Sequence, residues 1–596
     1  MTEGKKNQKQ KVQVKTFAVP FALGEIKENV SIPANTSKRP SKEQIINKAF
    51  KLHSEGKLLE AVKYYQYCIN QGFKDHIVFS NYGCLLKGLG KLQEAEIYTR
   101  KAVELNPNFA RSHFNLGSIL NDLGKLEEAE ISTRKAVELN PTFTEAHSNL
   151  GSILNDLGKL QEAEIATRKA VELNPTFAEA HSNLGSILKG LGKLQEAEIY
   201  TRKAIELKPD YTDAHSNLGN ILKGLGKLQE AEIYTRKAIK LNPNFARAHS
   251  NLGSILKDLG KLQEAEIYTR KAIKLKPNYA EAYNNLGNIF QDIGKLREAE
   301  NSFTKAIEMK SDFDSAYINR ACLYRDQGKL DKALTDSDSC NTQISRVLSL
   351  EILYELGRID EIYERIEKTA TFDNENIRLA SFSSFIAEQE KKNTSNNFCQ
   401  DPLSFLYFSN IKYHCKDYID FASKLIKDLS EVETIWEPIN KTTRNGFQTP
   451  THLNIFSNSS KSISKLKSII SNELESYYSK FEKESCSYIQ KWPKQKNIVG
   501  WHVILKKQGY QEAHIHPGGW LSGVIYLKVV PPLEKDEGAI EFSLNGQTYF
   551  NINSPKLTYL PELGDIVLFP SSLHHRTIPF SSDTDRIVIS FDLIPD

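Results

Sequence analysis

A unit of 34 residues recurs between residues 42 and 347, and this repeat limits what that part of the chain can fold into. Apolar residues such as Leu116, Ile119 and Leu120 recur at helical spacing before a turn at Gly124-Lys125, and a second amphipathic run follows. Each unit therefore predicts two antiparallel helices. One unit cannot bury its apolar face alone, so the units are expected to stack into an all-α solenoid. The period is marked by Gly83, Gly117, Gly151, Gly185, Gly219, Gly253 and Gly287 and by Pro107, Pro141, Pro175, Pro209, Pro243 and Pro277.

Further positions give the repeat a family resemblance. Ala129 and Ala136 fall in the second helix, where small residues let the two helices approach closely, and Asn140-Pro141 ends that helix. A 34-residue period with this pattern resembles the tetratricopeptide repeat. With the glycine at the eighth position, nine repeats run over 42–75, 76–109, 110–143, 144–177, 178–211, 212–245, 246–279, 280–313 and 314–347. The outer repeats depart from the pattern, with Phe73, Ser311 and Ser345 at proline positions and Ala49 and Ala321 in place of the glycine.

The sixth position of every repeat is asparagine, which suggests a binding surface. An amide side chain both donates and accepts, so a row of them can satisfy the backbone of an extended peptide without reading its sequence. The row resembles the asparagine ladder of O-linked N-acetylglucosamine transferase and implies a protein or peptide partner on the concave face. Alternatively, duplication copied the residue, or it caps a neighbouring helix. The row consists of Asn47, Asn81, Asn115, Asn149, Asn183, Asn217, Asn251, Asn285 and Asn319.

Histidine recurs at the fourth position, but its spacing argues against a metal site. The residues lie one repeat apart rather than in a cluster, and other repeats have Phe79, Tyr283 or Tyr317 there. A packing role is therefore predicted for His113, His147, His181, His215 and His249.

The composition excludes several classes of protein. The net charge is only +4, with 78 basic and 74 acidic residues, which argues against nucleic-acid partners and anionic membrane surfaces. The seven cysteines form no CxxC pair, so neither a disulfide framework nor a structural zinc is expected, and the compartment should be reducing. No run approaches the ~18 apolar residues of a membrane span. Residues 1–41 are expected to be a disordered basic arm without a secretory signal, and the protein is expected to be cytoplasmic.

The pattern changes towards the C-terminus. We expect residues 348–397 to form a degenerate helical capping segment or linker, with an out-of-register helical pair over 348–395. We expect residues 398–596 to form a separate domain. Its first part, 399–490, predicts helices with a loop over 442–449. Its β core, 499–596, predicts eight short strands in a jelly roll, which makes the whole chain an α+β multidomain protein. The strands are predicted at 499–505, 512–516, 521–530, 539–544, 556–560, 565–569, 574–578 and 586–594.

Histidines and an arginine recur on these strands. His514 and His516 lie two apart, so that on a strand both side chains project from one face. The pair His574-His575 begins a later strand, and Arg586 begins the last one. This order of residues, together with the sequences of segments 514–527 and 564–591, resembles the Fe(II)- and 2-oxoglutarate-dependent oxygenases. Within that family the resemblance is closest to prolyl hydroxylases and to oxygenases linked to tetratricopeptide repeats.

The resemblance implies a metal site. His514 would be the first ligand, and His516 stands where the family's site of two histidines and one carboxylate has the carboxylate. His575 rather than His574 would be the distal ligand, because the family's proline falls four residues after that histidine, here Pro579. Three imidazoles still bind divalent iron.

The resemblance also implies a cosubstrate site. Arg586 would pair with the distal carboxylate of 2-oxoglutarate, Tyr526 falls where prolyl hydroxylases place a tyrosine on that carboxylate, and Ser590 is a further candidate.

Three nearby residues receive other interpretations. Glu512 lies on the same strand face as the first two histidines, which leaves a second triad open: Glu512, one of those histidines, and His575. Asp565 and His502 are interpreted as structural.

The implied activity is oxidative decarboxylation of 2-oxoglutarate coupled to C–H hydroxylation, with Fe(II), 2-oxoglutarate and ascorbate as cofactors. The attached repeats favour a polypeptide or carrier-bound substrate. A repeat scaffold with a degenerate oxygenase domain is the alternative, and oxidation of a small molecule stays open. Glycosyl transfer, suggested only by the asparagine row, is excluded because no pair of nucleotide-sugar domains remains in the other 200 or so residues.

Overall fold

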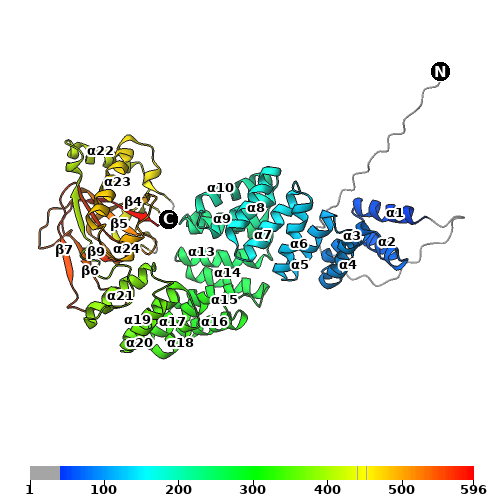
Figure 1. Cartoon of the computed structure of the whole chain (residues 1–596), viewed down its shortest axis with the longest axis horizontal. Coiled ribbons are helices and arrows are strands. Elements are labelled where there is room, and N and C mark those ends of the chain that lie inside the picture. Colours follow the sequence, from blue (N-terminus) through cyan, green and yellow to red (C-terminus); the bar gives the residue numbers. More distant parts are fainter. Residues whose placement is uncertain (1–40, 439–440, 451–452, 596) are drawn as a thin grey trace, which may run out of the picture. The chain divides into compact units, whose positions relative to one another are not determined.

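The computed structural model describes residues 41–438, 441–450 and 453–595, so the predicted N-terminal arm lies outside the described residues except for Ser41. The chain divides into two compact units, and the division falls between Ile221 and Leu222 in the sequence. Antiparallel helix pairs follow one another through the repeats (Figure 1). None of the described helices is both long and apolar enough to cross a membrane.

The first unit holds the early repeats. Its helices are α1 (Lys42–Ser54), α2 (Leu58–Asn70), α3 (His76–Gly88), α4 (Leu92–Leu105), α5 (Ala110–Asp122), α6 (Leu126–Leu139), α7 (Thr144–Asp156), α8 (Leu160–Leu173), α9 (Ala178–Gly190), α10 (Leu194–Leu207) and most of α11 (Thr212–Gly224).

The recurring glycine allows the two helices of a pair to touch. A Cβ at Gly117 would lie 2.1 Å from Oγ1 of Thr133, so no other residue fits without movement. Thr133 in turn donates to the carbonyl of Ala129 (2.8 Å), which satisfies its hydroxyl inside the contact. The turn between the helices depends on Gly124, whose φ of +74° is left-handed and favours glycine. The period of 34 therefore reflects a packing requirement in each pair.

The second unit continues the helical array. Its helices are α12 (Leu228–Leu241), α13 (Ala246–Asp258), α14 (Leu262–Leu275), α15 (Ala280–Ile293), α16 (Leu296–Met309), α17 (Asp314–Asp326), α18 (Leu330–Asp338), α19 (Gln343–Glu355), α20 (Ile359–Thr369) and α21 (Ile377–Glu390). The change of register begins earlier than expected, because Thr342 caps α19 and starts it inside the predicted ninth repeat. Three helices, α19 to α21, stand where one further pair was expected.

A curled antiparallel sheet forms the rest of this unit. Its strands are β1 (Tyr407–Asn410), β2 (Ile435–Trp436), β3 (Thr443–Gln448), β4 (Asn497–His514), β5 (Leu521–Lys528), β6 (Ile540–Ser543), β7 (Lys556–Tyr559), β8 (Asp565–Pro570), β9 (His574–Thr577) and β10 (Arg586–Ile594). The order is β1-β8-β5-β10-β4-β9-β6-β7, and β3 also pairs with β2 and β4. The predicted fold class, a helical repeat solenoid followed by an antiparallel β domain, is confirmed.

Two local expectations about the strands were wrong. The segment 442–449 is not only a loop, because β3 lies within it and pairs with β4. The predicted strands 499–505 and 512–516 are one long strand, β4, that ends at His514. The chain passes through the intervening polar residues with Gln508 at a φ of +62°, and the register with β3 shifts there, so the apparent break is an irregularity inside one strand.

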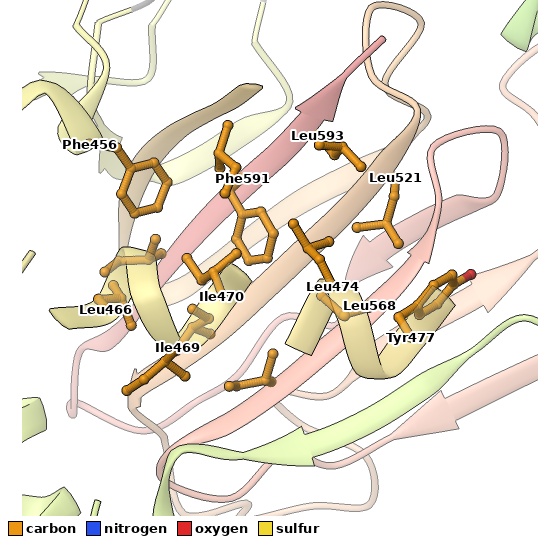
Figure 2. Close-up of a cluster of buried hydrophobic side chains, with 14 of the residues drawn as sticks. Phe456, Leu466, Ile469, Ile470, Leu474, Tyr477, Leu521, Leu568, Phe591 and Leu593 are labelled. Carbon is orange, nitrogen blue, oxygen red and sulfur yellow. The ribbon is translucent and has the colours of Figure 1, made fainter. Parts of the chain in front are cut away.

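Helices cover one face of the sheet. The main one is α23 (Lys461–Phe481), with α22 (Tyr418–Ser430) and the short α24 (Ser487–Gln490) beside it in the sequence. Figure 2 shows Leu466, Ile470 and Leu474 of α23 directed at side chains from the strands, among them Leu568 and Phe591. Each fully buried side chain of this size contributes roughly 1.5–3 kcal/mol. This packing holds the sheet that carries the histidines.

The last array helices pack onto the β domain. Phe382 and Phe385 of α21 contact the ring of Tyr549, at centroid distances of 5.2 and 4.8 Å. One buried cluster includes residues of α19 and α21 together with Val503, Val524 and other side chains of the strands. The end of the array and the β domain therefore share a core.

Candidate metal centre

Three histidines meet at one end of the sheet. His514 is the last residue of β4 and pairs directly across with His575 of β9. His516 lies just beyond β4 rather than on a strand as expected, and its backbone N–H donates to the carbonyl of Ser571 (3.0 Å). The ring centroids are 4.3 Å apart for His514 and His575, 5.1 Å for His514 and His516, and 5.0 Å for His516 and His575.

Hydrogen bonds set the tautomer of each ring. Nδ1 of His514 lies 2.7 Å from the carbonyl of Glu512, and Nδ1 of His575 lies 3.3 Å from that of Leu573. Nδ1 of His516 lies 2.6 Å from a carboxylate oxygen of Asp592. Because each of these oxygens only accepts, Nδ1 carries the proton and Nε2 keeps its lone pair. One ligand atom from each ring lies within 4.8 Å of the others, a spacing that suits one metal ion.

Asp592 is a residue that the sequence analysis missed. Ser522 Oγ donates to the same carboxylate oxygen (2.7 Å) and lies 2.8 Å from Ser571 Oγ. Asp592 is thereby held against the ring of His516, as outer-shell carboxylates orient metal-bound imidazoles. One signal could have found it: Asp592 is six residues after Arg586 on β10, on the same face of that strand.

Burial keeps these rings neutral. It lowers the pKa of His514 to about 3, with the nearby His516 as a second cause, and it lowers the pKa of His575 well below its ordinary value. At neutral pH these two imidazoles therefore hold no second proton, and their lone pairs are available to a metal.

The alternative ligand Glu512 is engaged elsewhere. Its carboxylate lies 3.1 Å from Nε of Arg444. In the described part of the chain, the cluster of metal-ligating atoms contains the three histidines and no carboxylate.

The other histidines near the site contact other elements. Nδ1 of His574 lies 3.1 Å from Oγ of Ser381 on α21, so the side chain of His574 contacts a helix whereas that of His575 lies in the histidine cluster. Nδ1 of His502 lies 2.9 Å from Oγ1 of Thr449 in the core. Asp565 accepts a hydrogen bond from Asn410 (2.8 Å) near a turn.

A buried arginine shares a narrow cavity with the histidines. Arg586 is only 2% exposed, and its guanidinium carbon lies 4.9 Å from the centre of the Tyr526 ring. Arg586 and Ser590 line the cavity together with His514, His516 and His575. Among the described residues, Nε and Nη1 of Arg586 and the hydroxyl of Tyr526 have no hydrogen-bond partner.

These unpartnered groups fit an anionic guest. A buried guanidinium without a counter-ion is costly, and burial accordingly lowers the pKa of Arg586 and raises that of Tyr526 to about 12. A carboxylate would accept from both side chains. The donors therefore suit a carboxylate, and the cavity that they share with the histidines is small, about 10 Å³.

A wider cavity opens the centre to the surface. It has a volume of about 390 Å³ and is lined by Trp501, Gln511, His514 and His516, by Asp592, and by residues of β3 and the segment after it. Trp501, Gln511 and the two histidines also line the narrow cavity, so the two spaces adjoin.

Several asparagines of the row make hydrogen bonds between neighbouring repeats, whereas Nδ2 of Asn149 has no partner among the described residues. Nδ2 of Asn183 donates to Ser148 Oγ of the preceding repeat (3.1 Å), and Asn285 donates in the same way to Ser250 (3.1 Å). One donor of such an amide is therefore used structurally, and Asn115 of the row is buried. The same bond occurs from Asn115 to Ser80, from Asn217 to Ser182 and from Asn319 to Asn284.

The histidines of the repeats have a local role. Nε2 of each lies 2.8–2.9 Å from the carbonyl of the proline six residues earlier, so the ring fastens one repeat to the end of the previous one. The predicted packing role fits this contact. The pairs are His113 with Pro107, His147 with Pro141, His181 with Pro175, His215 with Pro209 and His249 with Pro243.

Solved structures similar to this chain are repeat proteins. YrrB, described as a TPR protein with an unusual peptide-binding site, is 26% identical; the match covers 31% of this chain and 95% of that one, with a TM-score of 0.24. A tetratricopeptide repeat protein from Parabacteroides merdae is 22% identical over 40% of this chain and 97% of its own, with a TM-score of 0.34. MamA is 28% identical over 27% of this chain and 94% of its own, with a TM-score of 0.25. No curated protein matches the sequence.

Family models match both parts of the chain. Tetratricopeptide repeat models match residues 78–109, 98–131, 144–177, 178–211, 212–245 and 244–312. The model described as "Putative 2OG-Fe(II) oxygenase" matches residues 500–592, the segment that holds the three histidines and Arg586. The chain thus carries an array of tetratricopeptide repeats followed by a C-terminal segment, residues 500–592, that matches the model of the putative 2OG-Fe(II) oxygenases.

Proposed function

We propose that this protein is an Fe(II)- and 2-oxoglutarate-dependent dioxygenase that hydroxylates a polypeptide or carrier-bound substrate recruited by its repeats. One observation carries the proposal: three clustered imidazoles with unprotonated Nε2 atoms share a cavity with a buried arginine that has no counter-ion among the described residues. This combination provides ligands for a divalent metal and a partner for a dicarboxylate.

His514, His516 and His575 would hold the iron. Their Nδ1 bonds fix the rings in place, so little reorganisation is needed when the metal enters. When bound, iron with 2-oxoglutarate and dioxygen supplies an oxidant for C–H bonds, with succinate as the coproduct, and ascorbate would keep the metal reduced. Asp592 supplies one negative charge next to the ligand set, although it does not itself reach the metal position.

Arg586, Tyr526 and Ser590 would bind the cosubstrate. Arg586 would receive the distal carboxylate, and Tyr526, protonated at neutral pH because its pKa is about 12, would donate to the same group. Ser590 lines the same cavity, because it is four residues after Arg586 on β10 and therefore lies on the same face of that strand. These side chains orient the cosubstrate and exclude water from it.

The repeats would recruit the substrate. In the first unit a hollow of about 280 Å³ lies between α3 and α5, lined by Asn115 and Phe114 and by Lys87 and Ser118. An amide beside an aromatic ring suits a peptide, which offers both backbone groups and side chains. A tethered binding surface of this kind raises the concentration of a captured chain near the iron. The seven free cysteines support a reducing cytoplasmic location.

One observation favours a second candidate. The metal ligands in the described residues include no carboxylate, so the domain could be a structural part of a repeat scaffold. A scaffold would bind its partners equally well after His575→Ala and would release no succinate.

Succinate release tests the proposal. Purified protein is incubated with Fe(II), ascorbate and 2-oxoglutarate, with and without candidate peptides. We expect succinate in the wild type even without peptide, at a low uncoupled rate, and none from His575→Ala. The matched control is His249→Ala, which removes a repeat histidine of the same unit and should leave succinate release unchanged. Wild-type protein that binds iron yet releases no succinate under any condition would favour the scaffold.

A further inference from the structure

A second large cavity lies beside the metal centre, between the last array helices and the β domain. Its volume is about 440 Å³. One wall comes from α17, α19 and α21, through Ile318, Val347, Leu348 and Arg378 among others. The opposite wall comes from the β domain and includes His514.

This cavity continues into the one that opens the metal centre. Both are lined by Thr442, His514, Ile515 and Pro517, so the two spaces lie on either side of the same residues. Together the two cavities form a trough, and His514, the first candidate metal ligand, lies along it. Such a trough is longer than one small cosubstrate requires and suits an extended chain that enters on one side and leaves on the other.

Specific contacts hold the two walls together. Arg325 of α17 donates to the carbonyl of Thr548 (3.2 Å), and Ser381 of α21 lies 3.1 Å from the hydroxyl of Tyr549. Gln389 at the end of α21 donates to Ser554 (2.9 Å). The trough is therefore a feature of one packed body and not a gap between loosely joined parts.

The basic side chains that line the trough differ in whether they form ion pairs. Arg325 is neutralised by Glu351 (2.6 Å) and Glu355 (2.5 Å). Arg378 lines the cavity of about 440 Å³, and Lys441 lines the cavity of about 390 Å³ that opens the metal centre. Neither side chain has a hydrogen bond or ion pair to any described residue, although Lys441 lies within electrostatic reach of Asp592, which lines the same cavity. Each of the two cavities that share His514 is thus lined by one cation that has no ion pair with the described residues, among apolar side chains such as Val347 and Ile515.

We propose that the substrate is an extended acidic polypeptide segment that lies in this trough, with carboxylates at Arg378 and Lys441 and the reacting residue over the metal centre. This inference rests on the proposed function and adds the route and the chemical class of the substrate. Side chains of the segment would pack on the apolar wall of α17 and α19. Nucleic acid fits less well, because two free cations are few for a phosphate backbone.

Peptide binding tests the inference. Fluorescent peptides of repeating Glu-Val-Gly, Lys-Val-Gly and Gln-Val-Gly, and an oligothymidylate of similar length, are titrated against the full protein with Fe(II) and 2-oxoglutarate under anaerobic conditions. We expect the acidic peptide to bind about tenfold or more tightly than the others. Arg378→Glu should weaken that binding at least about tenfold, an effect of ~1.4 kcal/mol.

The matched control is Arg297→Glu on α16. Arg297 is also exposed and has no side-chain partner in the described residues, but it does not line the trough. Its variant should bind like the wild type. Equal binding by the wild type and Arg378→Glu, or preference for the basic peptide or the oligonucleotide, would overturn the inference.

Cross-linking locates the peptide without changing a charge. The photoreactive residue p-benzoylphenylalanine replaces Ile344, which is 54% exposed on the trough wall, or Ile419, which is 58% exposed on α22 outside it. The acidic peptide should cross-link at the first position and not at the second; the reverse would contradict the proposed route. The absorbance of the Fe(II)–2-oxoglutarate complex is recorded in the same samples. If it forms but no acidic peptide binds, only this inference fails, whereas its absence would remove the proposed function as well.

Discussion

Oδ1 of Asp592 lies 2.6 Å from Nδ1 of His516, so a carboxylate lies directly behind the imidazole that we assign to the family's carboxylate position. The carboxylate that the family has among its metal ligands is thus replaced by Asp592, which contacts the ligand candidate His516 at Nδ1. A histidine ligand backed by a carboxylate is a more basic and better oriented donor than a free imidazole. The departure from the familiar ligand set is therefore partly compensated within this chain.

Removal of that carboxylate should weaken metal binding. We expect Asp592→Asn to fold normally but to lose about 10–100-fold in affinity for Fe(II) or Co(II), because its amide can present a donor to Nδ1 and lacks the charge. Competition with a chelator measures the affinity. The control is Asp583→Asn, whose carboxylate is 88% exposed and should not matter. Unchanged affinity in Asp592→Asn would show that His516 needs no support.

Replacement of the buried arginine should separate metal from cosubstrate binding. We expect Arg586→Met to keep its affinity for iron and to lose stabilisation by 2-oxoglutarate, which in the wild type reaches about 2.7 kcal/mol at 100 times the Kd. Without ligand, Arg586→Met should unfold at an equal or higher temperature, because it removes a buried charge that has no counter-ion in the part of the chain that the structure describes. Thermal unfolding with and without 2-oxoglutarate measures both effects. Arg576→Met, at a side chain that is 49% exposed, is the control; a 2-oxoglutarate shift preserved in Arg586→Met would refute the assignment.

Residues that repeat or alternate locally were predictable from sequence. The glycine at Gly117 recurs in repeat after repeat because each helix pair meets the same steric limit, so the array could be placed almost to the residue. Strands β5 to β10 follow the alternation of apolar residues and were predicted within two or three residues of their ends. Strand alternation lets only one of His574 and His575 face inward, and the position of Pro579, four residues after His575, favoured His575.

Features that depend on distant partners were not predictable. β1 is only four residues long and β3 is mostly polar, and both are strands because they pair with β8 and β4. Asp592 acquires its role from His516, 76 residues earlier in the chain. The trough requires Arg378 and His514 to meet in one cavity, which no local pattern encodes.

Acid should destabilise the metal-free C-terminal domain. Burial lowers the pKa of His502 and His574 to about 4, whereas unfolded histidine titrates near ~6.5. Between these values the unfolded state binds more protons, so the free energy of unfolding falls as the pH drops below about 6.5, by about 2 kcal/mol per residue at pH 5. Below about pH 4 these two residues cause no further loss.

Tryptophan emission during urea unfolding measures this loss, because Trp436, Trp492, Trp501 and Trp520 all lie in that domain and no other tryptophan exists. A chelator keeps the protein free of metal. His502→Asn retains a polar group near Thr449 and should reduce the loss between pH 7.5 and 5 by about 2 kcal/mol. Identical losses in wild type and variant would contradict the assigned cause.

A pair of substitutions separates the two roles of the asparagine row. Ser148→Ala removes only the acceptor of the bond between repeats, whereas Asn183→Ala also removes the amide that would meet a peptide. We expect both to lower stability by about 1 kcal/mol, the usual worth of a hydrogen bond. Only Asn183→Ala should weaken capture of a partner peptide. Equal effects on capture would reduce the row to a structural device.

Anaerobic titration of the protein with Fe(II), with and without 2-oxoglutarate, tests the central claim most directly. We predict a metal-to-ligand charge-transfer band that appears only when both are present, is absent in His575→Ala, and is absent in Arg586→Met although that variant still binds iron. Wild-type protein that binds Fe(II) and shows no such band at saturating 2-oxoglutarate would contradict the proposed cosubstrate site.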